Sequence, residues 1–169
     1  MKKIFQFTIL ALLLASCGGS KKISKTSSKR TTTIRDNTSS PNKKLNNIID
    51  YATTFEGTRY KFGGTTKSGM DCSGLVFTAF AKENVQLPRV SRDMATRGKK
   101  VSLSKVKEGD LVFFQTNKNR RVINHVGLVT SAKGGAIRFI HSTTSRGVIV
   151  SSLEERYWKS AFVEVRRII

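Results

Sequence analysis

Cysteine, histidine and acidic side chains are scarce in this chain of 169 residues. It holds two cysteines and two histidines, and 11 Asp and Glu residues stand against 31 Lys and Arg residues. Two cysteines cannot form the disulfide framework of a small stapled scaffold, and two separated histidines with a lone thiol are too few for a standard zinc site. We therefore expect no metal and no other cofactor, and we look to these rare residues for chemistry.

The first 17 residues have the layout of a bacterial lipoprotein signal. Residues 2 and 3 are lysines, residues 4–15 are mostly apolar at signal-peptide length, and small residues precede Cys17. The bacterial lipobox has this pattern, in which the cysteine is acylated and becomes the mature N-terminus. The pattern predicts a signal peptide over residues 1–16 and a lipid anchor, palmitate included, on Cys17. The alternative is a secretory signal cleaved elsewhere, with Cys17 incidental.

Residues 17–44 join this signal to the rest of the chain. The segment is rich in Ser, Thr, Asn, Lys and Arg and has few large apolar residues, so we expect a flexible basic linker. Without Lys2 and Lys3 the chain keeps a net charge of +18. Behind a signal peptide this charge favours membrane headgroups or cell-wall carboxylates over nucleic acid, or is only a solvated surface. Gly18 favours sorting within the cell envelope to the periplasmic face of the outer membrane.

Residues 45–169 are long enough for one domain with its own core. Ser40 and Pro41 suit an N-cap and a first helical position, and apolar residues then recur at helical spacing up to Gly57. Three further helical segments are predicted, over residues 73–83, 92–96 and 153–158.

From Gly109 onward the pattern changes to short apolar runs that are typical of strands. Glycines in Gly134-Gly135 and in Ser145-Arg146-Gly147 mark hairpin turns. Helices followed by an antiparallel sheet make an α+β domain. The predicted strands cover residues 111–114, 125–130, 136–141, 148–151 and 161–169.

Cys72 is the only cysteine outside the first twenty residues. It follows a glycine-rich turn and precedes an apolar run at helical spacing, which places it at or just inside the N-terminus of the second helix. The helix dipole and the unpaired N–H groups there favour a thiolate, which is a nucleophile. Asp71 opposes this, because a nearby carboxylate raises the pKa of a thiol, and a protonated His125 would have to outweigh it. A disulfide with Cys17 is the alternative if that residue is not lipidated.

Both histidines lie on predicted strands, where they share a face with apolar neighbours: His125 with Val129, and His141 with Phe139. A hairpin between the two strands would bring the imidazoles together. If the second helix packs on the same face, a thiol, a base and an orienting group line up. His125 would then take the thiol proton and His141 would hold its ring. The alternative for each histidine is a structural position in the core.

Three polar residues near Cys72 are candidates for substrate contacts. The Tyr60 hydroxyl could help to hold an oxyanion or the scissile carbonyl, and its alternative is ordinary core packing. Asp71 and Ser73 flank the thiol. Asp71 is either an N-cap or a group that grips a substrate ammonium.

Several short motifs occur in a fixed order. They are Arg59-Tyr60-Lys61-Phe62-Gly63-Gly64, Asp71-Cys72-Ser73-Gly74, Leu87-Pro88-Arg89, Gly109-Asp110-Leu111-Val112-Phe113-Phe114, His125-Val126-Gly127 and Phe139-Ile140-His141. In this order, over nearly all of residues 45–169, they resemble the NlpC-type cell-wall cysteine peptidases, which are compact papain-like enzymes. The chain is most similar to the lipid-anchored, single-domain murein endopeptidases of that family.

The resemblance implies a Cys-His-His triad of Cys72, His125 and His141. It implies a monomeric hydrolase that cleaves amide bonds in peptidoglycan stem peptides or cross-links through a thioester. Tyr60 resembles a tyrosine beside the family's cysteine, and Asp71 and Ser73 match positions that in some members bind the free amine of a stem peptide. An acyltransferase or amidase on another envelope substrate, a wall-binding lipoprotein without activity, and a basic nucleic-acid binder are the alternatives.

Overall fold

The computed structural model describes residues 41–117 and 122–169, which all fall in the compact unit Asn37–Ile169. The predicted signal peptide, the lipid on Cys17 and residues 17–40 of the predicted linker lie outside the described residues. Within the described ranges, no helix has the length and apolar character needed to cross a membrane.

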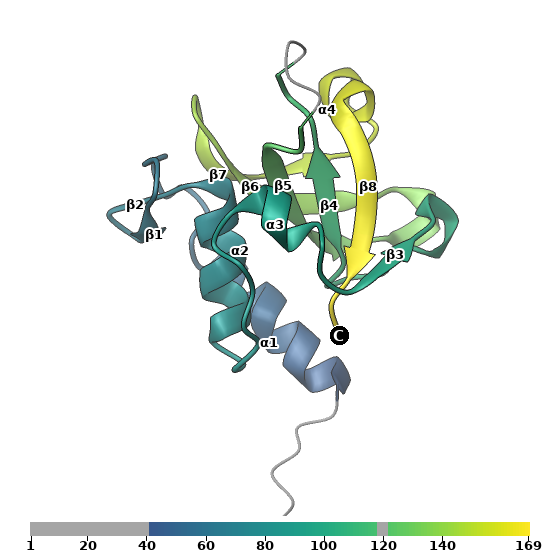
Figure 1. The fold of residues 1–169 in the computed structure, drawn as a ribbon, viewed down its shortest axis with the longest axis horizontal. Helices are drawn as coiled ribbons and strands as arrows, with labels where there is room; N and C mark the ends of the chain where they lie inside the picture. The colour runs from purple at the N-terminus through teal and green to yellow at the C-terminus, as the bar shows by residue number, and fades with distance from the viewer. Residues whose placement is uncertain (1–40, 118–121) are drawn as a thin grey trace, which may run out of the picture. The chain divides into compact units, whose positions relative to one another are not determined.

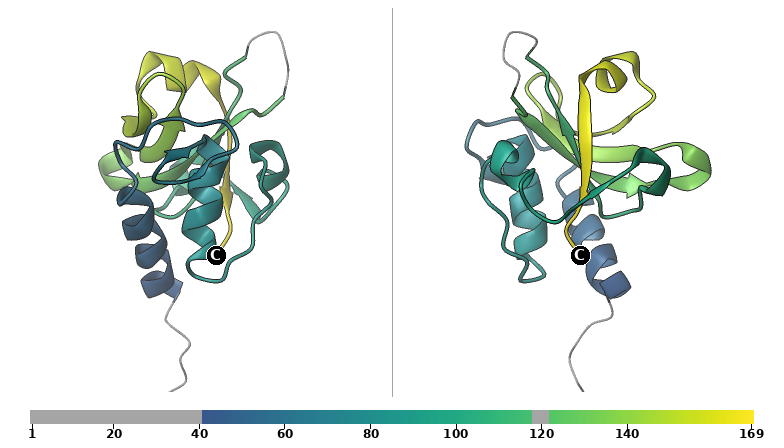
Figure 2. Two further views of the ribbon diagram at one scale, coloured as in Figure 1. Left: turned by 90° about the vertical axis from the view of Figure 1, so that its left-hand side faces the viewer. Right: turned by 45° about the vertical axis from the view of Figure 1, so that its right-hand side comes forward.

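The described residues form four α-helices, which lie before and between the strands: α1 Pro41–Thr53, α2 Cys72–Ala81, α3 Ser91–Met94 and α4 Arg156–Ala161. α1 begins at Pro41, as the sequence predicts, so residues 41–44 at the end of the predicted linker are helical. α1 buries Ile48 and Ala52, while α2 is apolar on most sides and buries six of its ten residues. An all-round apolar helix has to be covered on several sides, and α2 packs against both α1 and the sheet (Figures 1 and 2).

The main sheet has six strands in the order β3-β8-β4-β5-β6-β7, and neighbouring strands are antiparallel. A separate pair, β1 Thr65–Thr66 and β2 Gly69–Met70, precedes α2. Two short 3-10 helices, Leu103–Lys105 and Lys133–Gly135, lie in the connections. The strands of the main sheet are β3 Lys99–Val101, β4 Leu111–Phe114, β5 His125–Ser131, β6 Arg138–Thr143, β7 Gly147–Ser152 and β8 Phe162–Arg167.

The two faces of this sheet carry separate apolar cores. Leu111 and Phe113 of β4 contribute to the core that α1 and α2 cover, whereas Val112 and Phe114 contribute to the core that contains Trp158 of α4. This alternation is the two-residue period of a strand. α1 and α2 therefore lie on one face of the sheet, and α4 closes the other.

The predicted α+β class is confirmed, and the main helices and strands lie where the sequence placed them, with shifts at their ends. The fourth helix begins at Arg156 rather than near residue 153. The sequence missed β3 because Lys99 and Lys100 are exposed on an edge strand and give no apolar alternation. It also missed β1 and β2, whose two residues each are too short for a pattern.

Candidate active site

Cys72 is the first residue of α2, and the residue before it caps the helix. The Asp71 carboxylate accepts hydrogen bonds from the Gly74 N–H at 2.6 Å and from the Gly63 N–H at 2.8 Å. A carboxylate at the N-cap satisfies helix N–H groups that have no partner within the helix. Asp71 is therefore the N-cap of α2, which is one of the two interpretations that the sequence offered. Its hydrogen bonds fix the backbone at Cys72.

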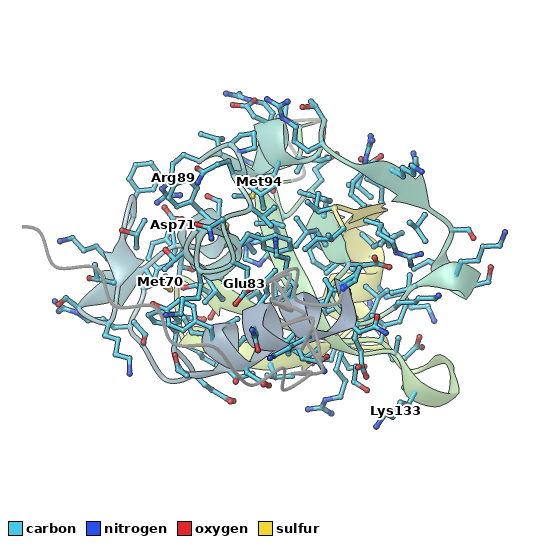
Figure 3. The ribbon with its side chains drawn as sticks, turned by 90° about the horizontal axis from the view of Figure 1, so that it is seen from below. Met70, Asp71, Glu83, Arg89, Met94 and Lys133 are labelled. Atoms are coloured by element: carbon cyan, nitrogen blue, oxygen red, sulfur yellow. The ribbon has the colours of Figure 1, made fainter. Side chains whose placement is uncertain are left out.

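Arg89 completes this arrangement from a distant part of the chain. Its two terminal nitrogens donate to the two oxygens of Asp71 at 2.9 and 2.8 Å, and Nη1 also donates to the Ser73 hydroxyl at 2.9 Å. Ser73 in turn donates to Asp71 at 3.2 Å. Figure 3 shows Arg89 and Asp71 side by side at α2. Burial alone would raise the pKa of Asp71, but Arg89 and two backbone N–H groups lower it below its ordinary value, so the carboxylate is ionised.

The start of α2 also needs a glycine. A β-carbon on Gly74 would collide with the backbone oxygen of Gly64 and would lie 3.1 Å from both Arg89 and Asp71. The glycine turn before Cys72 and the first turn of α2 are therefore in direct contact. This contact explains the glycine that follows Cys72 and Ser73 in the sequence motif.

The two histidines meet on the other face of the sheet. His125 Nε2 and His141 Nδ1 are 2.8 Å apart, and both side chains are buried. β5 and β6 pair directly, with Leu128 opposite Ile140 and Val129 opposite Phe139. The hairpin predicted between these strands therefore exists, and it brings the imidazoles together as expected.

Aromatic rings enclose this pair. The Trp158 ring stacks on His125 at 5.1 Å between centroids and meets His141 edge-on at 4.5 Å. Phe139 lies 4.7 Å from His141, and Phe114 lies 5.9 Å from His125. Packed rings on several sides fix the orientation of both imidazoles and keep water away from them.

Burial keeps both imidazoles neutral. Desolvation lowers the pKa of His125 to about 4, and desolvation, His125 and the positive charge of Arg146 lower the pKa of His141 to about 2. His125 is therefore the one that takes up a proton first. His141 Nε2 is buried and has no hydrogen-bond partner within residues 41–117 and 122–169.

A catalytic role for His125 would require one particular tautomer of this pair. If His125 is to accept a proton on Nδ1, its Nε2 has to carry a hydrogen and donate to His141 Nδ1. His141 then carries its own hydrogen on Nε2, where it makes no hydrogen bond. The arrangement leaves His125 Nδ1 as the basic atom of the pair.

The helix that carries Cys72 packs on a different face of the sheet from the one predicted. The sequence allows a helix packed on the face that carries the histidines, but α2 packs on the opposite face, against Val126 and Leu128. Its N-terminus instead lies at the end of β5, where the backbone of Val126 hydrogen-bonds to the Cys72 sulfur. His125 is the first residue of β5, so the thiol and the imidazole border the same pocket at the end of the sheet.

The thiol is not pre-ionised by the helix. Burial, with a further contribution from Asp71, raises the pKa of Cys72 to about 11, although hydrogen bonds from the backbone of Val126 and Ser73 oppose the shift. The backbone N–H groups at the helix N-terminus favour the thiolate as expected, but burial outweighs them and the net shift favours the neutral thiol. Cys72 and His125 both rest in their neutral forms at neutral pH.

Tyr60 stands beside the thiol. Burial is the main cause that raises the pKa of its hydroxyl, followed by the neighbouring Cys72 and Asp71. The hydroxyl therefore remains a hydrogen-bond donor at neutral pH. Tyr60 is only half-buried, which does not fit simple core packing.

Two pockets meet at Cys72, and Tyr60 and Asn124 border both. The first, which we call the Arg89 pocket, has a volume of about 660 Å³ and is bordered by Phe62, Asp71, Ser73 and Arg89 among others. The second, the Arg146 pocket, has a volume of about 420 Å³ and is bordered by His125, Arg146, Glu155 and Trp158 among others. Together they form a continuous binding surface on both sides of the thiol.

A third pocket, of about 650 Å³, lies away from Cys72 at α1 and the end of β8 and includes none of the predicted site residues. Within the described residues, no cluster of His, Cys, Asp and Glu could hold a metal ion.

Two residues of this site were missed by sequence reasoning. Arg89 ends the short motif Leu87-Pro88-Arg89, but only the fold shows that its side chain forms an ion pair with Asp71. Trp158 lies in a segment predicted as a helical turn, and nothing in its local sequence indicates contact with the histidines. The rarity of tryptophan, with one in the chain, was the available signal.

The sequence of this chain is similar to those of known cell-wall endopeptidases. The model of the NlpC/P60 family matches residues 57–167. Murein DD-endopeptidase MepS/Murein LD-carboxypeptidase of Escherichia coli (strain K12) is 41% identical over 123 residues, which cover 72% of this chain and 62% of that protein. Probable endopeptidase NlpC of the same strain is 34% identical over 168 residues, which cover 95% of this chain and 96% of that protein.

Solved structures agree with these matches. An NlpC/P60 family protein from Bacillus cereus ATCC 10987 superposes with a TM-score of 0.66 at 27% identity, over 73% of this chain and 39% of that one. The peptidoglycan hydrolase RipB from Mycobacterium tuberculosis gives a TM-score of 0.61 at 28% identity, over 76% and 66%. The chain belongs to the NlpC/P60 family.

Proposed function

We propose that this protein is a cysteine peptidase that hydrolyses amide bonds in peptidoglycan stem peptides or their cross-links. The observation that carries the proposal is the 2.8 Å contact between His125 and His141 on a pocket that Cys72 also lines. A thiol, a base and a group that orients the base are the parts that nucleophilic catalysis requires. Relatives named as a murein endopeptidase and a peptidoglycan hydrolase indicate the substrate class.

In the proposed reaction, Cys72 Sγ attacks the carbonyl carbon of the scissile amide while its proton passes to His125 Nδ1. The raised pKa of the thiol and the lowered pKa of the imidazole oppose this transfer when each group is considered alone. Charge that develops on the attacking sulfur and on the imidazole has opposite signs, so the two charges stabilise each other in a dry site. His141 accepts the Nε2 hydrogen of His125 and so stabilises the imidazolium.

The tetrahedral intermediate then collapses. The C–N bond breaks, His125 returns its proton to the leaving amine, and a thioester remains on Cys72. A water molecule attacks the thioester after giving a proton to His125. The carboxylic acid leaves, and the proton returns to the sulfur.

Tyr60 is the proposed donor to the oxygen on which negative charge develops. Its hydroxyl stays protonated and stands beside Cys72. One such donor contributes about 3 kcal/mol to transition-state stabilisation in comparable sites.

The substrate-binding role of Asp71 and Ser73 remains a prediction. Both side chains line the Arg89 pocket, but their hydrogen bonds are made to Arg89, to each other and to backbone N–H groups. We infer that their first task is to fix the start of α2 and therefore the position of Cys72.

We also propose that Cys17 carries lipid and that the protein is held at the cell envelope. The support is the pattern of residues 1–17. Cells that carry the wild-type chain or Cys17→Ser would be labelled with a palmitate analogue and fractionated. Label and membrane association that persist in Cys17→Ser would overturn the proposal.

The test of the activity is digestion of purified peptidoglycan with the protein and with Cys72→Ala, followed by product identification by mass. We expect new stem fragments or lost cross-links with the wild type only, and the product masses name the bond. Ser104→Ala, which removes an exposed hydroxyl remote from the site, is the matched control. No products from a folded wild-type protein would contradict the proposal, and acyl transfer to an added amine without hydrolysis would favour an acyltransferase.

A further inference from the structure

The base of this site has no anionic partner among the described residues. His125 Nε2 contacts His141 Nδ1 at 2.8 Å, and burial keeps His141 neutral. None of the ion pairs within residues 41–117 and 122–169 includes His125. An imidazolium that forms on His125 during the proposed reaction is therefore a buried charge that needs stabilisation beyond the hydrogen bond to His141.

The other titratable groups around His125 do not supply this stabilisation. Arg146, in the turn between β6 and β7, is positive and disfavours a second positive charge nearby. Tyr60 and Cys72 have raised pKa values and are neutral. The Glu155 carboxylate, directly before α4, borders the same pocket, but it accepts a backbone N–H at 2.7 Å and does not oppose the lowered pKa of either imidazole.

The indole ring of Trp158 lies where it can interact with a charge on His125. The two ring centroids are 5.1 Å apart and the ring planes differ by 21°, so the rings are stacked. The face of an indole is the negative side of its quadrupole, and a cation within about 6 Å of the ring centroid is attracted to it. Trp158 is only 5% exposed, and such a contact is stronger when it is desolvated.

Neighbouring rings hold Trp158 in this orientation. Phe114, Phe139 and Tyr157 meet it at steep angles, with centroids 5.0, 5.7 and 4.8 Å away. Among the described residues, His125 is the only ring that is stacked on Trp158. The aromatic cluster therefore fixes the indole in parallel contact with the one imidazole that takes up the proton.

We propose that Trp158 is a positioning residue that stabilises the imidazolium of His125 through a cation–π contact. It thereby takes part of the role that a carboxylate has beside the histidine of a Ser-His-Asp triad. The inference rests on the proposed function, in which His125 accepts the thiol proton. It differs from packing, because the contribution depends on the electron density of the indole face and not on its shape.

The test exploits the fact that Trp158 is the only tryptophan of the chain. Incorporation of tryptophans with one, two and three ring fluorines then changes a single position of the full-length protein. Each fluorine withdraws electron density from the indole face and alters its shape little. We expect kcat for a soluble stem peptide to fall stepwise along the series, by about 2- to 30-fold in total, with little change in KM.

The pKa of His125 gives a readout that a packing role would not move. The full-length Cys72→Ala protein would be titrated by nuclear magnetic resonance of its imidazoles, which are only two in this chain. Weaker attraction to the imidazolium favours the neutral form, so the pKa of His125 should fall with each added fluorine. The acidic limb of the pH profile of kcat/KM should move to lower pH in the same order.

A pair of substitutions provides an independent check. Trp158→Phe keeps a weaker aromatic face and should retain more activity than Trp158→Leu. Phe162→Leu is the matched control, because Phe162 packs against the same core but its ring contact is with Phe114 and not with an imidazole. Circular dichroism checks that each variant is folded.

The inference and the proposed function can fail separately. A pKa of His125 that stays constant along the fluorinated series would overturn the inference, and so would an unchanged kcat, while cleavage by the unmodified protein keeps the proposed function. No cleavage of peptide or peptidoglycan by the unmodified protein would overturn the proposed function. The magnetic resonance titration still tests the contact in that case, because the imidazolium forms without substrate.

Discussion

At the scale of single residues, burial lowers the pKa of both histidines, and it lowers that of His141 more than that of His125. His141 is fully buried, touches Phe139 and Trp158, and keeps an unused Nε2. Its lowered pKa makes it a permanent acceptor, so that His125 is the one that carries the proton. In the proposed reaction, the role of His141 is therefore to position and stabilise His125 rather than to touch the substrate.

This role gives a prediction for His141→Asn and His141→Ala. Asparagine offers an amide oxygen in place of Nδ1, so we expect activity within about 10-fold of the wild type, whereas alanine should lower kcat by about 100-fold or more with little change in KM. Steady-state kinetics on a soluble stem peptide measure both constants. Equal losses in the two variants would show that His141 is only a packing residue.

The alkylation of Cys72 is a second residue-scale prediction. Since burial raises the thiol pKa to about 11, iodoacetamide should label Cys72 more slowly than free cysteine at pH 7.5, and the rate should rise up to about pH 11. Mass spectrometry of the labelled peptide follows the rate. A plateau at or below pH 8 would mean that a thiolate exists in the resting protein.

At the scale of elements, the start of α2 is the most constrained part of the site. It is tied to the glycine turn through Gly63 and Gly64, and to the loop after α2 through Arg89. This clamp holds the thiol at the end of β5 although α2 packs on the opposite face from the histidines. The register between β5 and β6 then holds the histidines relative to each other.

Removal of the clamp should affect stability and reactivity together. Asp71→Ala removes the N-cap and the partner of Arg89, so we expect the free energy of unfolding to fall by about 2–3 kcal/mol. Urea unfolding followed by circular dichroism measures the loss, and peptide cleavage measures activity. Asp93→Ala, which breaks an exposed ion pair with Arg92, is the matched control and should change stability by less than about 1 kcal/mol. Similar losses in both variants would contradict the clamp.

At the scale of the whole molecule, the sheet separates a core shared with α1 and α2 from a core that includes Trp158, and both histidines project into the second one. Under the proposed mechanism, groups that act in catalysis are also core residues, which connects activity to folding. Their titration in the unfolded chain, where they are exposed, then affects the stability of the entire domain.

Acid should therefore destabilise the domain in a defined range of pH. The unfolded chain binds protons on its histidines below about pH 6.5, while folded His125 stays neutral down to about pH 4. Because the unfolded state binds more protons in this interval, the free energy of unfolding falls as the pH drops from 6.5 through 4, by roughly 3 kcal/mol from His125.

Urea unfolding at several pH values, read from the fluorescence of Trp158, checks this slope. His141→Asn should flatten it, because that variant removes one of the two buried imidazoles. A free energy of unfolding that is constant between pH 6.5 and 4 would show that the histidines are not held neutral by the fold.

The sequence by itself determined the α+β class, the order of the main elements and the rare residues that are candidates for the site. These features depend on local patterns: helical spacing after Pro41 and Cys72, alternation around His125 and His141, and glycines at the hairpin turn. The short motifs also indicated the family. Local patterns suffice here because periodicity and turn chemistry are properties of neighbouring residues.

Only the tertiary structure decided which face α2 covers, that Arg89 pairs with Asp71, that Trp158 stacks on His125, and that the Cys72 thiol rests protonated. The residues of each pair lie far apart in the chain, and the burial of a group depends on everything that packs around it. The spacing of residues along the sequence therefore predicts neither these long-range contacts nor the burial of the thiol. A helix N-terminus alone predicts a thiolate, whereas the assembled site, which removes water from the sulfur, favours the neutral thiol.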